Sequence, residues 1–448
     1  MSAEAQLEAL LAIINTSARQ AIAEYKKSGD VPTINSTSPH PLDSAADTVA
    51  LKKAVRLLEG ACQQLCVSLA PPQHTLINLT ENFDWACAGA AIRAKIADVL
   101  ADFPNGLHVA ELADIVHIEK GKLCRLLRVL ACKGCFLEVD VDVFANNRLS
   151  LMLKSSSNVS CLARIYAQDV SQAAESLYET LVDPDFAASY EPDKAPLIYA
   201  LRKRNIQGSF FDWMREDDER RENYHRAMVG LGDVMGSLSV LHHYPWNEVS
   251  TVCDVGASIG TFSLPLAKKF PHLKITDQDL PEVLVQATEV WQKDAPEAVE
   301  EKRIEFIPLN FFEEIPAQGK DVYYASLHLL LRNIIHDWPD AEAAVIIRNV
   351  RRAMAPHSRL LIHDYVLSSA SPKLRSSTLG QELAPEPMLP NFGSGNIRMY
   401  QQDLNMWFIH NAKERTVQDS VTLGAAAGLR LEKIYDLAES SVLEFRIA

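Results

Sequence analysis

The sequence lacks long apolar runs and an excess of positive charge. No stretch approaches the ~18 consecutive apolar residues of a membrane-spanning helix. Its 44 Lys and Arg residues are outnumbered by 58 Asp and Glu residues, which gives a net charge of −14, whereas nucleic-acid binding requires a concentrated basic surface. We therefore expect neither a membrane nor a nucleic acid among the partners. The first helical pattern, Met1 to Tyr25, lacks the charged-then-apolar layout of a signal peptide, which predicts a cytoplasmic protein.

The eight cysteines show no zinc-binding spacing. Cys132 and Cys135 form one Cys-x-x-Cys pair, but no second Cys or His pair stands at the spacing of a metal site. The other cysteines lie in apolar helix-like or strand-like stretches, where a reduced and buried thiol is the ordinary state. We expect no bound metal.

A chain of 448 residues is too long for a single core, and its patterns divide it into three segments. Residues 1–80 hold two helical stretches around a Pro- and Ser-rich loop, Val31 to Ser44, and end at a second break, Ala70 to His74. Residues 81–170 predict three helices followed by a strand hairpin, which is the pattern of a winged helix. These helices are expected over Ile92–Phe103, Val109–Val116 and Leu123–Lys133.

Residues 171–448 begin as helix and alternate between strand and helix from Val249 onward. The predicted strands are Thr251–Val255, Leu273–Ile275, Ile304–Ile307, Asp321–Tyr324 and Arg359–Ile362. Helices are predicted over Phe262–Phe270, Pro281–Gln292 and Ala341–Met354. This alternation predicts an α/β domain with a mostly parallel, Rossmann-like sheet that carries helices on both faces.

A glycine-containing turn, Asp254-Val-Gly256-Ala-Ser-Ile-Gly260, follows the first of these strands and precedes a helix. Glycine suits such a turn because the backbone bends sharply and approaches a ligand closely. The turn is neither the Gly-x-Gly-x-x-Gly of nicotinamide-binding proteins nor the Gly-Lys-Ser/Thr of a phosphate loop. Asp279, at the end of the second strand, can bind both ribose hydroxyls of a nucleoside or cap the following helix. Acids at two neighbouring strand ends favour the nucleoside.

A third motif, Leu331 to Asp340, follows a strand and precedes a helix. We therefore expect it at the carboxyl edge of the sheet, where ligands bind in this architecture. It contains His336, flanked by Asp337 and preceded four residues earlier by Arg332. A histidine with a neighbouring carboxylate has what a general base requires.

Together these motifs resemble those of the caffeic-acid-type O-methyltransferases, and most closely their fungal, secondary-metabolite branch. Four motifs occur in the order and spacing of that family: Asp254-Val-Gly256, Asp279-Leu-Pro281, His336-Asp-Trp-Pro339 and Lys413-Glu414-Arg415-Thr416. The resemblance covers roughly residues 60–448. It implies an N-terminal winged-helix dimerisation domain, a Rossmann-like methyltransferase domain, a homodimer and a small-molecule substrate. Apolar residues that it places between subunits are Leu57, Leu58, Ile92, Ile96 and Leu100.

The resemblance also implies roles for individual residues. His336 is expected to deprotonate the acceptor hydroxyl of an aromatic or polyketide-type compound, and Asp364 and Glu414 are expected to orient it. The residues expected to bind S-adenosyl-L-methionine are Gly256, Ala257, Asp279, Asn310, Phe311 and Arg332. Candidates for the acceptor pocket, each of which can equally be an ordinary core residue, are Phe210, Phe211, Trp213, Met399, Met406, Trp407 and Phe408.

Three functional hypotheses follow. Intact His336, Asp364 and Glu414 favour an O-methyltransferase. Ala257 and Asn310 stand where the family usually has Gly and Asp, and these departures favour a pericyclase, cyclase or dehydratase on the same fold that does not consume the cofactor. Only the winged helix, with its basic third helix, favours a non-catalytic regulator.

Overall fold

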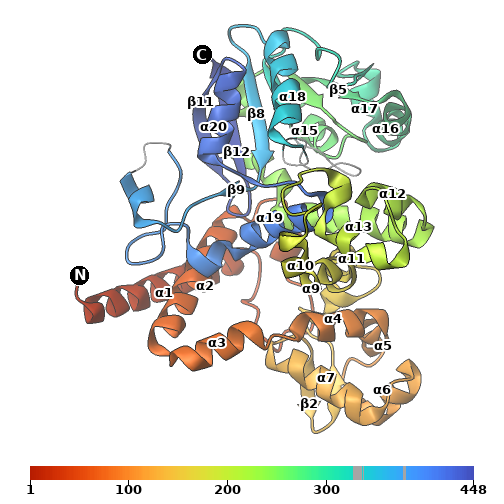
Figure 1. Cartoon of the computed structure of the whole chain (residues 1–448), viewed down its shortest axis with the longest axis vertical. Coiled ribbons are helices and arrows are strands. Elements are labelled where there is room, and N and C mark those ends of the chain that lie inside the picture. The colour runs from red at the N-terminus through yellow and green to blue at the C-terminus, as the bar shows by residue number, and fades with distance from the viewer. Residues whose placement is uncertain (326–334, 336–337, 377–379) are drawn as a thin grey trace.

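The computed structural model of the chain describes residues 1–325, 335, 338–376 and 380–448 (Figure 1). The alternating strands and helices of the second half form one end of the molecule along its longest axis. The helices and small sheet of residues 84–145 form the other end. Helices from two distant parts of the chain lie between these ends.

Among the described residues, the main sheet has seven strands in the order β11-β12-β8-β7-β4-β5-β6. Five strands pair in parallel: β4 (Thr251–Val255), β5 (Lys274–Asp279), β6 (Ile304–Pro308), β7 (Val322–Ala325) and β8 (Arg359–Asp364). Two more continue the sheet in antiparallel pairing: β11 (Leu429–Asp436) and β12 (Ser441–Ile447). The predicted α/β class and mostly parallel sheet are confirmed. The strand order reverses between β4 and β7, and ligands bind beyond the carboxyl ends of strands at such a switch point.

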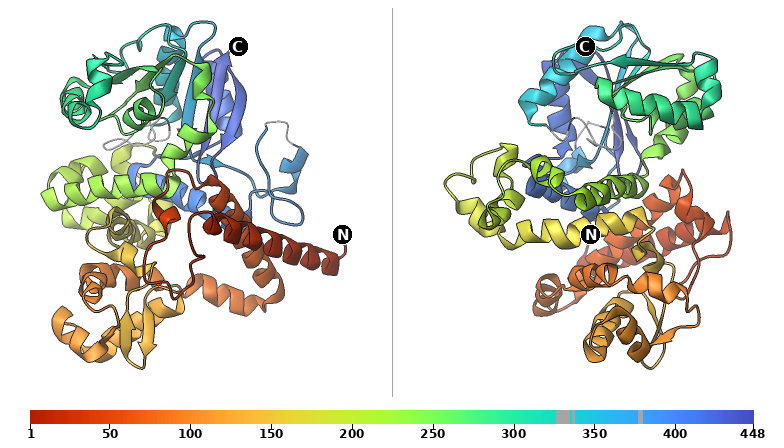
Figure 2. Two further views of the ribbon diagram at one scale, coloured as in Figure 1. Left: turned by 180° about the vertical axis from the view of Figure 1, so that it is seen from behind. Right: turned by 90° about the vertical axis from the view of Figure 1, so that its right-hand side faces the viewer.

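Helices cover both faces of this sheet (Figure 2). One face packs against α15 (Ser263–Lys269) and α16 (Pro281–Asp294), and the other against α18 (Asp340–Ala353) and α20 (Val417–Ala426). α18 buries Ala343, Ile346, Ile347 and Val350, which recur at the spacing of one helical face. Shorter elements complete this part of the chain: α14 (Val240–His243), α17 (Pro296–Glu300), β9 (Val366–Leu367) and β10 (Arg415–Thr416).

Residues 84–145 contain the helices and hairpin that the sequence predicts, with one correction. The predicted helix over Ile92–Phe103 is two helices, because Lys95 adopts a left-handed φ of 53° between them. The helices are α4 (Asp84–Arg93), α5 (Ile96–Ala101), α6 (Val109–Val116) and α7 (Lys120–Cys132). A small sheet of β1 (Leu107–His108), β3 (Val143–Ala145) and β2 (Leu137–Asp140) lies beside them.

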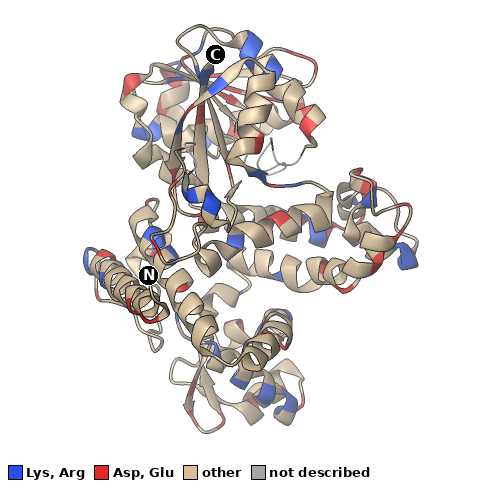
Figure 3. Ribbon diagram, turned by 60° about the vertical axis from the view of Figure 1, so that its left-hand side comes forward, with Lys and Arg blue, Asp and Glu red and all other residues tan. Residues whose placement is uncertain are grey.

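The basic residues of α7 and of its C-cap, Lys133, are partly neutralised within the chain. Arg128 forms ion pairs with Glu138 at 2.7 Å and with Asp142 at 3.0 Å, and Lys133 pairs with Asp84 at 2.9 Å. Figure 3 shows acidic and basic positions interspersed along the ribbon.

The first segment is a helical hairpin followed by a helix that the sequence did not predict. α1 (Ala3–Lys26) packs on α2 (Val49–Leu69). The break expected over Ala70–His74 is only partly correct, because α3 (Pro72–Thr80) begins inside it, and proline is favourable in a first helical turn. The hairpin is anchored to the C-terminal half by Arg56, which binds Asp436 at 3.1 Å.

Helices from two parts of the chain form the layer between the ends. The first group is α8 (Asn158–Ile165), a π-helical turn η3 (Tyr166–Val170), α9 (Ser171–Glu175), α10 (Leu177–Val182), α11 (Pro196–Leu201), α12 (Phe210–Arg215) and α13 (Asp218–Met235). α19 (Ile397–His410) packs among them. α8, α13 and α19 share one apolar core, and the α8 and α13 pair lies at its centre. In the described parts of the chain, no helix is both long and apolar enough to cross a membrane.

Candidate active site

The glycine turn lies at the carboxyl end of β4, beside the point where the strand order reverses. Gly256 and Gly260 have φ values of 77° and 85°, which glycine adopts without strain. The backbone N–H groups of Gly256 and Ala257 donate to the carbonyl oxygen of Gln278 on β5 at 2.7 and 3.1 Å. A Cβ atom on Gly260 would lie 2.2 Å from Nε1 of Trp291. Both the positive φ and the close contact with Trp291 therefore require glycine at position 260.

Asp279 ties this turn to the end of β5. Its carboxylate accepts hydrogen bonds from the backbone N–H groups of Ser258 and Leu280, each at 2.8 Å. The N-cap of α16 is Leu280, so Asp279 is not the helix cap that the sequence left open. Asp279 stands where the turn meets the end of the second strand, the position that the nucleoside hypothesis requires.

Several buried polar atoms around the turn have no hydrogen-bond partner among the described residues. They are both carboxylate oxygens of Asp254, Oγ of Ser258 and Oγ1 of Thr261. Burial, and then the neighbouring carboxylates Asp277 and Asp279, raise the pKa of Asp254 well above its usual range. An unpaired buried polar group costs about 1–3 kcal/mol, so such groups are normally satisfied. Their clustering at one turn indicates a polar ligand that binds there.

Asn310 and Phe311 follow the end of β6, one strand beyond Asp279. Oδ1 of Asn310 accepts a hydrogen bond from the backbone N–H of Phe312 at 3.1 Å, so this oxygen is engaged in a local turn. The ring of Phe311 packs on Phe312 with 4.8 Å between centroids. Both residues therefore lie along the same carboxyl edge of the sheet as the glycine turn.

Two buried acids, Asp364 and Glu414, are brought together by short strands. Asp364 ends β8 and is 7% exposed, and Glu414 precedes β10 and is 4% exposed. β9 and β10 pair in parallel with Arg415 opposite Val366, which places Glu414 beside Tyr365, the residue that follows Asp364. The two segments that carry the acids expected to flank the catalytic histidine are thus adjacent, although the acids are 50 positions apart in the sequence.

Arg415 links these acids to the segment that contains the histidine motif. Its guanidinium donates to the carbonyl oxygens of Ile335 and Trp338 and pairs with Asp340 at 2.8 Å. His336 and Arg332 themselves lie outside the described residues. Ile335 and Trp338, which precede and follow residues 336–337, are therefore held by the neighbour of Glu414.

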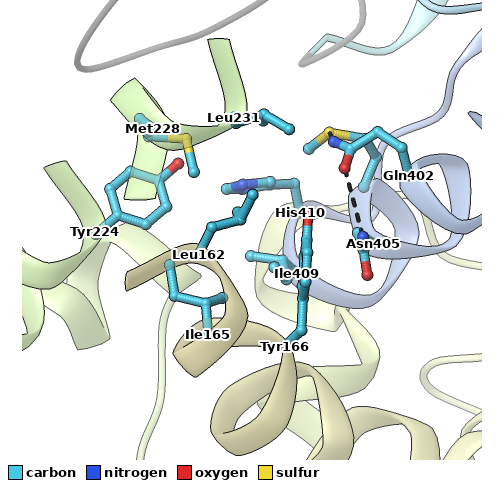
Figure 4. A pocket seen from close by; sticks show the side chains of 11 residues that line it. Leu162, Ile165, Tyr166, Tyr224, Met228, Leu231, Gln402, Asn405, Ile409 and His410 are labelled. Carbon is cyan, nitrogen blue, oxygen red and sulfur yellow. Dashed lines mark hydrogen bonds between the residues drawn. The ribbon is translucent and has the colours of Figure 1, made fainter. Parts of the chain in front are cut away.

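A mostly apolar pocket lies between α8, the π-helical turn, α13 and α19 (Figure 4). Its lining residues are Leu162, Ile165, Tyr166, Tyr224, Met228, Leu231, Gln402, Asn405, Met406, Ile409 and His410. Figure 4 shows these side chains converging from the three helices and the turn. The π-helical turn widens the helix where Tyr166 enters the pocket, and such turns recur at functional sites.

Of the sequence-based candidates for this pocket, only Met406 lines it. Phe210, Trp213, Met399 and Phe408 are at most 5% exposed and belong to the core, so the ordinary alternative was correct for them. The polar members of the lining were missed. A signal for the α19 wall exists in the sequence, because Gln402, Asn405, Met406, Ile409 and His410 recur at the spacing of one helical face.

The fold and site combine a Rossmann-like sheet, a glycine turn that is not a phosphate loop, and a separate, mostly apolar pocket. A family profile described as O-methyltransferase domain matches residues 199–430. A 3-O-methyltransferase 2 of Phanerochaete chrysosporium is 38% identical over 449 residues, which cover 98% of this chain and 97% of the relative.

Two of the solved structures with a similar fold illustrate the likeness. The mitomycin 7-O-methyltransferase MmcR superposes with a TM-score of 0.62 at 24% identity, over 84% of this chain and 98% of that one. A structure described as a pericyclic reaction enzyme superposes with a TM-score of 0.66 at 20% identity, over 90% and 95%.

The chain belongs to the O-methyltransferase family. It is an O-methyltransferase enzyme, and its cofactor is S-adenosyl-L-methionine. The hypothesis of a non-catalytic regulator was therefore wrong. The sharp glycine turn at the carboxyl end of β4 and the unpaired buried polar atoms of Asp254, Ser258 and Thr261 fit a polar, nucleoside-bearing cofactor.

Proposed function

We propose that this enzyme methylates a hydroxyl group of an aromatic or polyketide-type secondary metabolite, with His336 as the general base. The observation that carries the proposal is the position of the apolar pocket. Gln402 lines the pocket, and the next residue of α19, Asp403, accepts a hydrogen bond from the backbone N–H of Glu414 at 2.8 Å. One helix therefore joins the acceptor pocket to an acid proposed to orient the base.

The chemistry of the pocket favours a flat, largely apolar acceptor. Leu, Ile and Met side chains form most of its wall, and aromatic or thioether contacts stabilise an aromatic ring. A few polar groups at the edge can fix the orientation of a hydroxyl-bearing ring, as is usual in small-molecule sites. These groups belong to Tyr166, Tyr224, Gln402, Asn405 and His410.

When bound, S-adenosyl-L-methionine supplies a methyl group that its sulfonium has already activated. We assign its binding to Gly256, Ala257, Asp279, Asn310, Phe311 and Arg332. His336 accepts the proton of the acceptor hydroxyl while the new O–CH3 bond forms and the S–CH3 bond breaks. Asp364 and Glu414 hold the imidazole in the productive orientation. Alignment supplies much of the rate, and proton removal adds about 10²–10⁴-fold.

Mass spectrometry of reactions with methyl-deuterated S-adenosyl-L-methionine tests this function. A panel of phenolic and polyketide-type acceptors is incubated with the enzyme, with and without the cofactor. We expect the labelled methyl group on the acceptor oxygen and one demethylated cofactor per product. Product that forms without the label would contradict the proposal.

A second candidate is a pericyclase or dehydratase that leaves the cofactor intact. Ala257 and Asn310 favour it because they alter the turn and remove one charge at the cofactor edge, and the likeness in fold to a pericyclic reaction enzyme agrees with it. In that reaction His336 would act as an acid or hydrogen-bond donor. The labelling experiment separates the two functions, because only methyl transfer moves the label.

We further propose a homodimer formed through the first 170 residues. Ile96 and Leu100 lie in the chain's own core and are not available to a partner. α3 instead has no buried residue, and Leu79 on it is 75% exposed. Sedimentation of L76E/L79E, two changes on α3, should show monomers at a concentration where the unmodified enzyme is dimeric. A monomeric unmodified enzyme would contradict the proposal.

The division into a helical segment of residues 1–80, a winged-helix domain of 81–170 and a methyltransferase domain of 171–448 stays part of this proposal, as does a cytoplasmic location. Limited proteolysis tests the first boundary, because cleavage should concentrate near residue 80, whereas residue 170 lies between the π-helical turn and α9 in the shared apolar core. Cleavage distributed evenly along the chain would contradict it.

A further inference from the structure

Three carboxyl groups share one face of the sheet beneath the cofactor turn. Asp254 on β4 lies directly opposite Asp277 on β5 in the parallel register. Asp279 stands two residues beyond Asp277, so its side chain leaves the strand on the same face. Asp254 is 1% exposed and Asp277 is fully buried.

The described strands and helices packed against this cluster contribute hydrogen bonds but no cation that pairs with Asp254 or Asp277. The lateral neighbours in the sheet are Tyr324 on β7, opposite Asp254, and Phe306 on β6, opposite Asp277. From α15, Oγ of Ser263 donates to Asp277 at 2.8 Å. α16 contributes the Trp291 indole, which like Ser263 lowers the pKa of Asp277 without outweighing burial, and Glu282 in its first turn adds another negative charge near Asp279.

The other titratable side chains near the cluster either bind elsewhere or carry no charge. Lys320 binds Oγ1 of Thr276, which projects from the opposite face of β5. His363 contacts Tyr324 and Ser440, and burial lowers its pKa to about 4, so it is neutral at physiological pH. The Cys253 thiol, whose pKa burial raises, stays protonated. Within the described part of the chain, no Lys, Arg or His forms a hydrogen bond or ion pair with Asp254 or Asp277.

Two buried carboxyl groups side by side without a counter-ion cannot both be ionised at low cost. Burial raises the pKa of Asp277 to about 8, and the pKa of Asp254 is also raised. The free enzyme therefore holds at least one proton on this pair at neutral pH. Both carboxylate oxygens of Asp254 and Oγ of Ser258 are unpaired in the described structure, and they lie where the cofactor turn begins.

We propose that Asp277, paired with Asp254, makes the enzyme discriminate between S-adenosyl-L-methionine and its demethylated product by coupling cofactor binding to loss of a proton. The sulfonium of the cofactor is a positive charge that enters a region of low dielectric, where it favours an ionised carboxylate. S-adenosyl-L-homocysteine has no sulfonium charge, so it expels the proton less completely. The inference rests on the cofactor alone and is independent of the acceptor and of the base.

The same coupling gives a direction to the catalytic cycle. Methyl transfer removes the positive charge from sulfur, and the carboxyl pair then takes up a proton again. The product loses its electrostatic partner and binds more weakly than the cofactor did. Asp277 is in this sense a specificity-determining residue, although it is not expected to touch the reacting atoms.

Isothermal titration calorimetry of the full-length enzyme tests the proposal. Each ligand is titrated at about pH 7.5 in buffers of different ionisation enthalpy, and the slope of the observed enthalpy gives the number of protons released. We expect S-adenosyl-L-methionine to release clearly more protons than S-adenosyl-L-homocysteine. Asp277→Asn should remove most of this difference and reduce the preference for the cofactor over the product by at least about fivefold.

Glu282→Gln is the matched control, because it removes one formal charge from an exposed position near the same site. It should leave the proton release unchanged. The cofactor affinity of the unmodified enzyme should rise with pH up to about 8, because the complex binds fewer protons than the free enzyme. Equal proton release for the two ligands, a difference that survives in Asp277→Asn, or no binding of either ligand would overturn the proposal. A circular dichroism spectrum and melting curve establish that the variant is folded.

Discussion

The cofactor edge and the proposed acceptor pocket of this enzyme are built in different ways. The cofactor edge is local, because residues 254–260 form one turn and Asp279 follows at the end of the next strand. The acceptor pocket draws its wall from α8, α13 and α19, which span residues 158 to 410. Local motifs keep their backbone geometry wherever they occur, whereas a pocket wall depends on how distant helices pack. The two regions should therefore respond to mutation in different ways.

The largest expected effect is on the cofactor edge. Gly260→Ala places a Cβ 2.2 Å from Nε1 of Trp291 at a positive φ of 85°. We expect cofactor affinity to fall more than about 100-fold, because the turn must move away from α16. The matched control is Gly319→Ala, since Gly319 also has a positive φ but no atom within 4 Å of the added Cβ. It should cost only about 1 kcal/mol of stability and leave affinity unchanged. Equal effects of the two changes would contradict this account.

The next effect is on turnover. Asp364→Asn and Glu414→Gln should each lower kcat by about 10- to 1,000-fold, because a misoriented imidazole accepts the proton poorly. Cofactor affinity, measured by calorimetry, should stay within about twofold. Glu313→Gln changes an exposed acid and should alter neither quantity. A parallel loss of cofactor affinity in the first two variants would assign these acids to the cofactor edge instead.

A smaller effect, on the acceptor KM, distinguishes a residue that lines the pocket from one that belongs to the core. Met406 and Met399 lie on the same helix and are both 5% exposed, but only Met406 lines the pocket. Met406→Ala should raise the acceptor KM about tenfold, through the loss of about 1–2 kcal/mol of apolar contact. Met399→Ala should lower the free energy of unfolding by about 2–5 kcal/mol and leave the ratio of rates between acceptors unchanged. A shift in acceptor preference in Met399→Ala, without one in Met406→Ala, would place the pocket elsewhere.

The smallest effect concerns stability and pH. Burial raises the pKa of Asp277 to about 8, so between about pH 4 and pH 8 the folded chain binds more protons than the unfolded chain. The free energy of unfolding must then fall as the pH rises through this window. Asp277→Asn removes that loss and should raise the Tm by a few degrees at pH 8, and by less at pH 5.

Asp321 provides a control of opposite sign. Burial raises its pKa, but hydrogen bonds from the backbone N–H groups of Ser250 and Thr251 outweigh burial and lower it overall. Its contribution to stability is therefore present at neutral pH and is lost as the pH falls through its lowered pKa. Asp321→Asn should lower the Tm more at pH 7 than at pH 3. The same sign of Tm change in both variants at neutral pH would contradict these assignments.

The same contrast explains how far the sequence predicts the structure. The five parallel strands were recognised because buried strands leave short apolar runs between helices, and Thr251–Val255 agrees with β4 at both ends. The break at Lys95 was missed because no glycine or proline marks it, and α3 was missed because its prolines indicated a loop. The pairing of β9 with β10, which brings Glu414 beside the end of β8, depends on tertiary contacts between distant residues. Resemblance to a family, rather than periodicity, singled out Glu414.

The central claim is that His336 serves the acceptor side and not the cofactor side. The most direct test compares His336→Ala with His243→Ala, which alters an exposed histidine paired with Asp47. Cofactor binding is measured by calorimetry and methyl transfer by mass spectrometry on the same samples. The account predicts that His336→Ala loses at least about 100-fold in kcat while its Kd for S-adenosyl-L-methionine stays within about twofold, and that His243→Ala is unchanged in both. Full methyl transfer by His336→Ala, or a loss of cofactor binding that matches the loss of turnover, would contradict it.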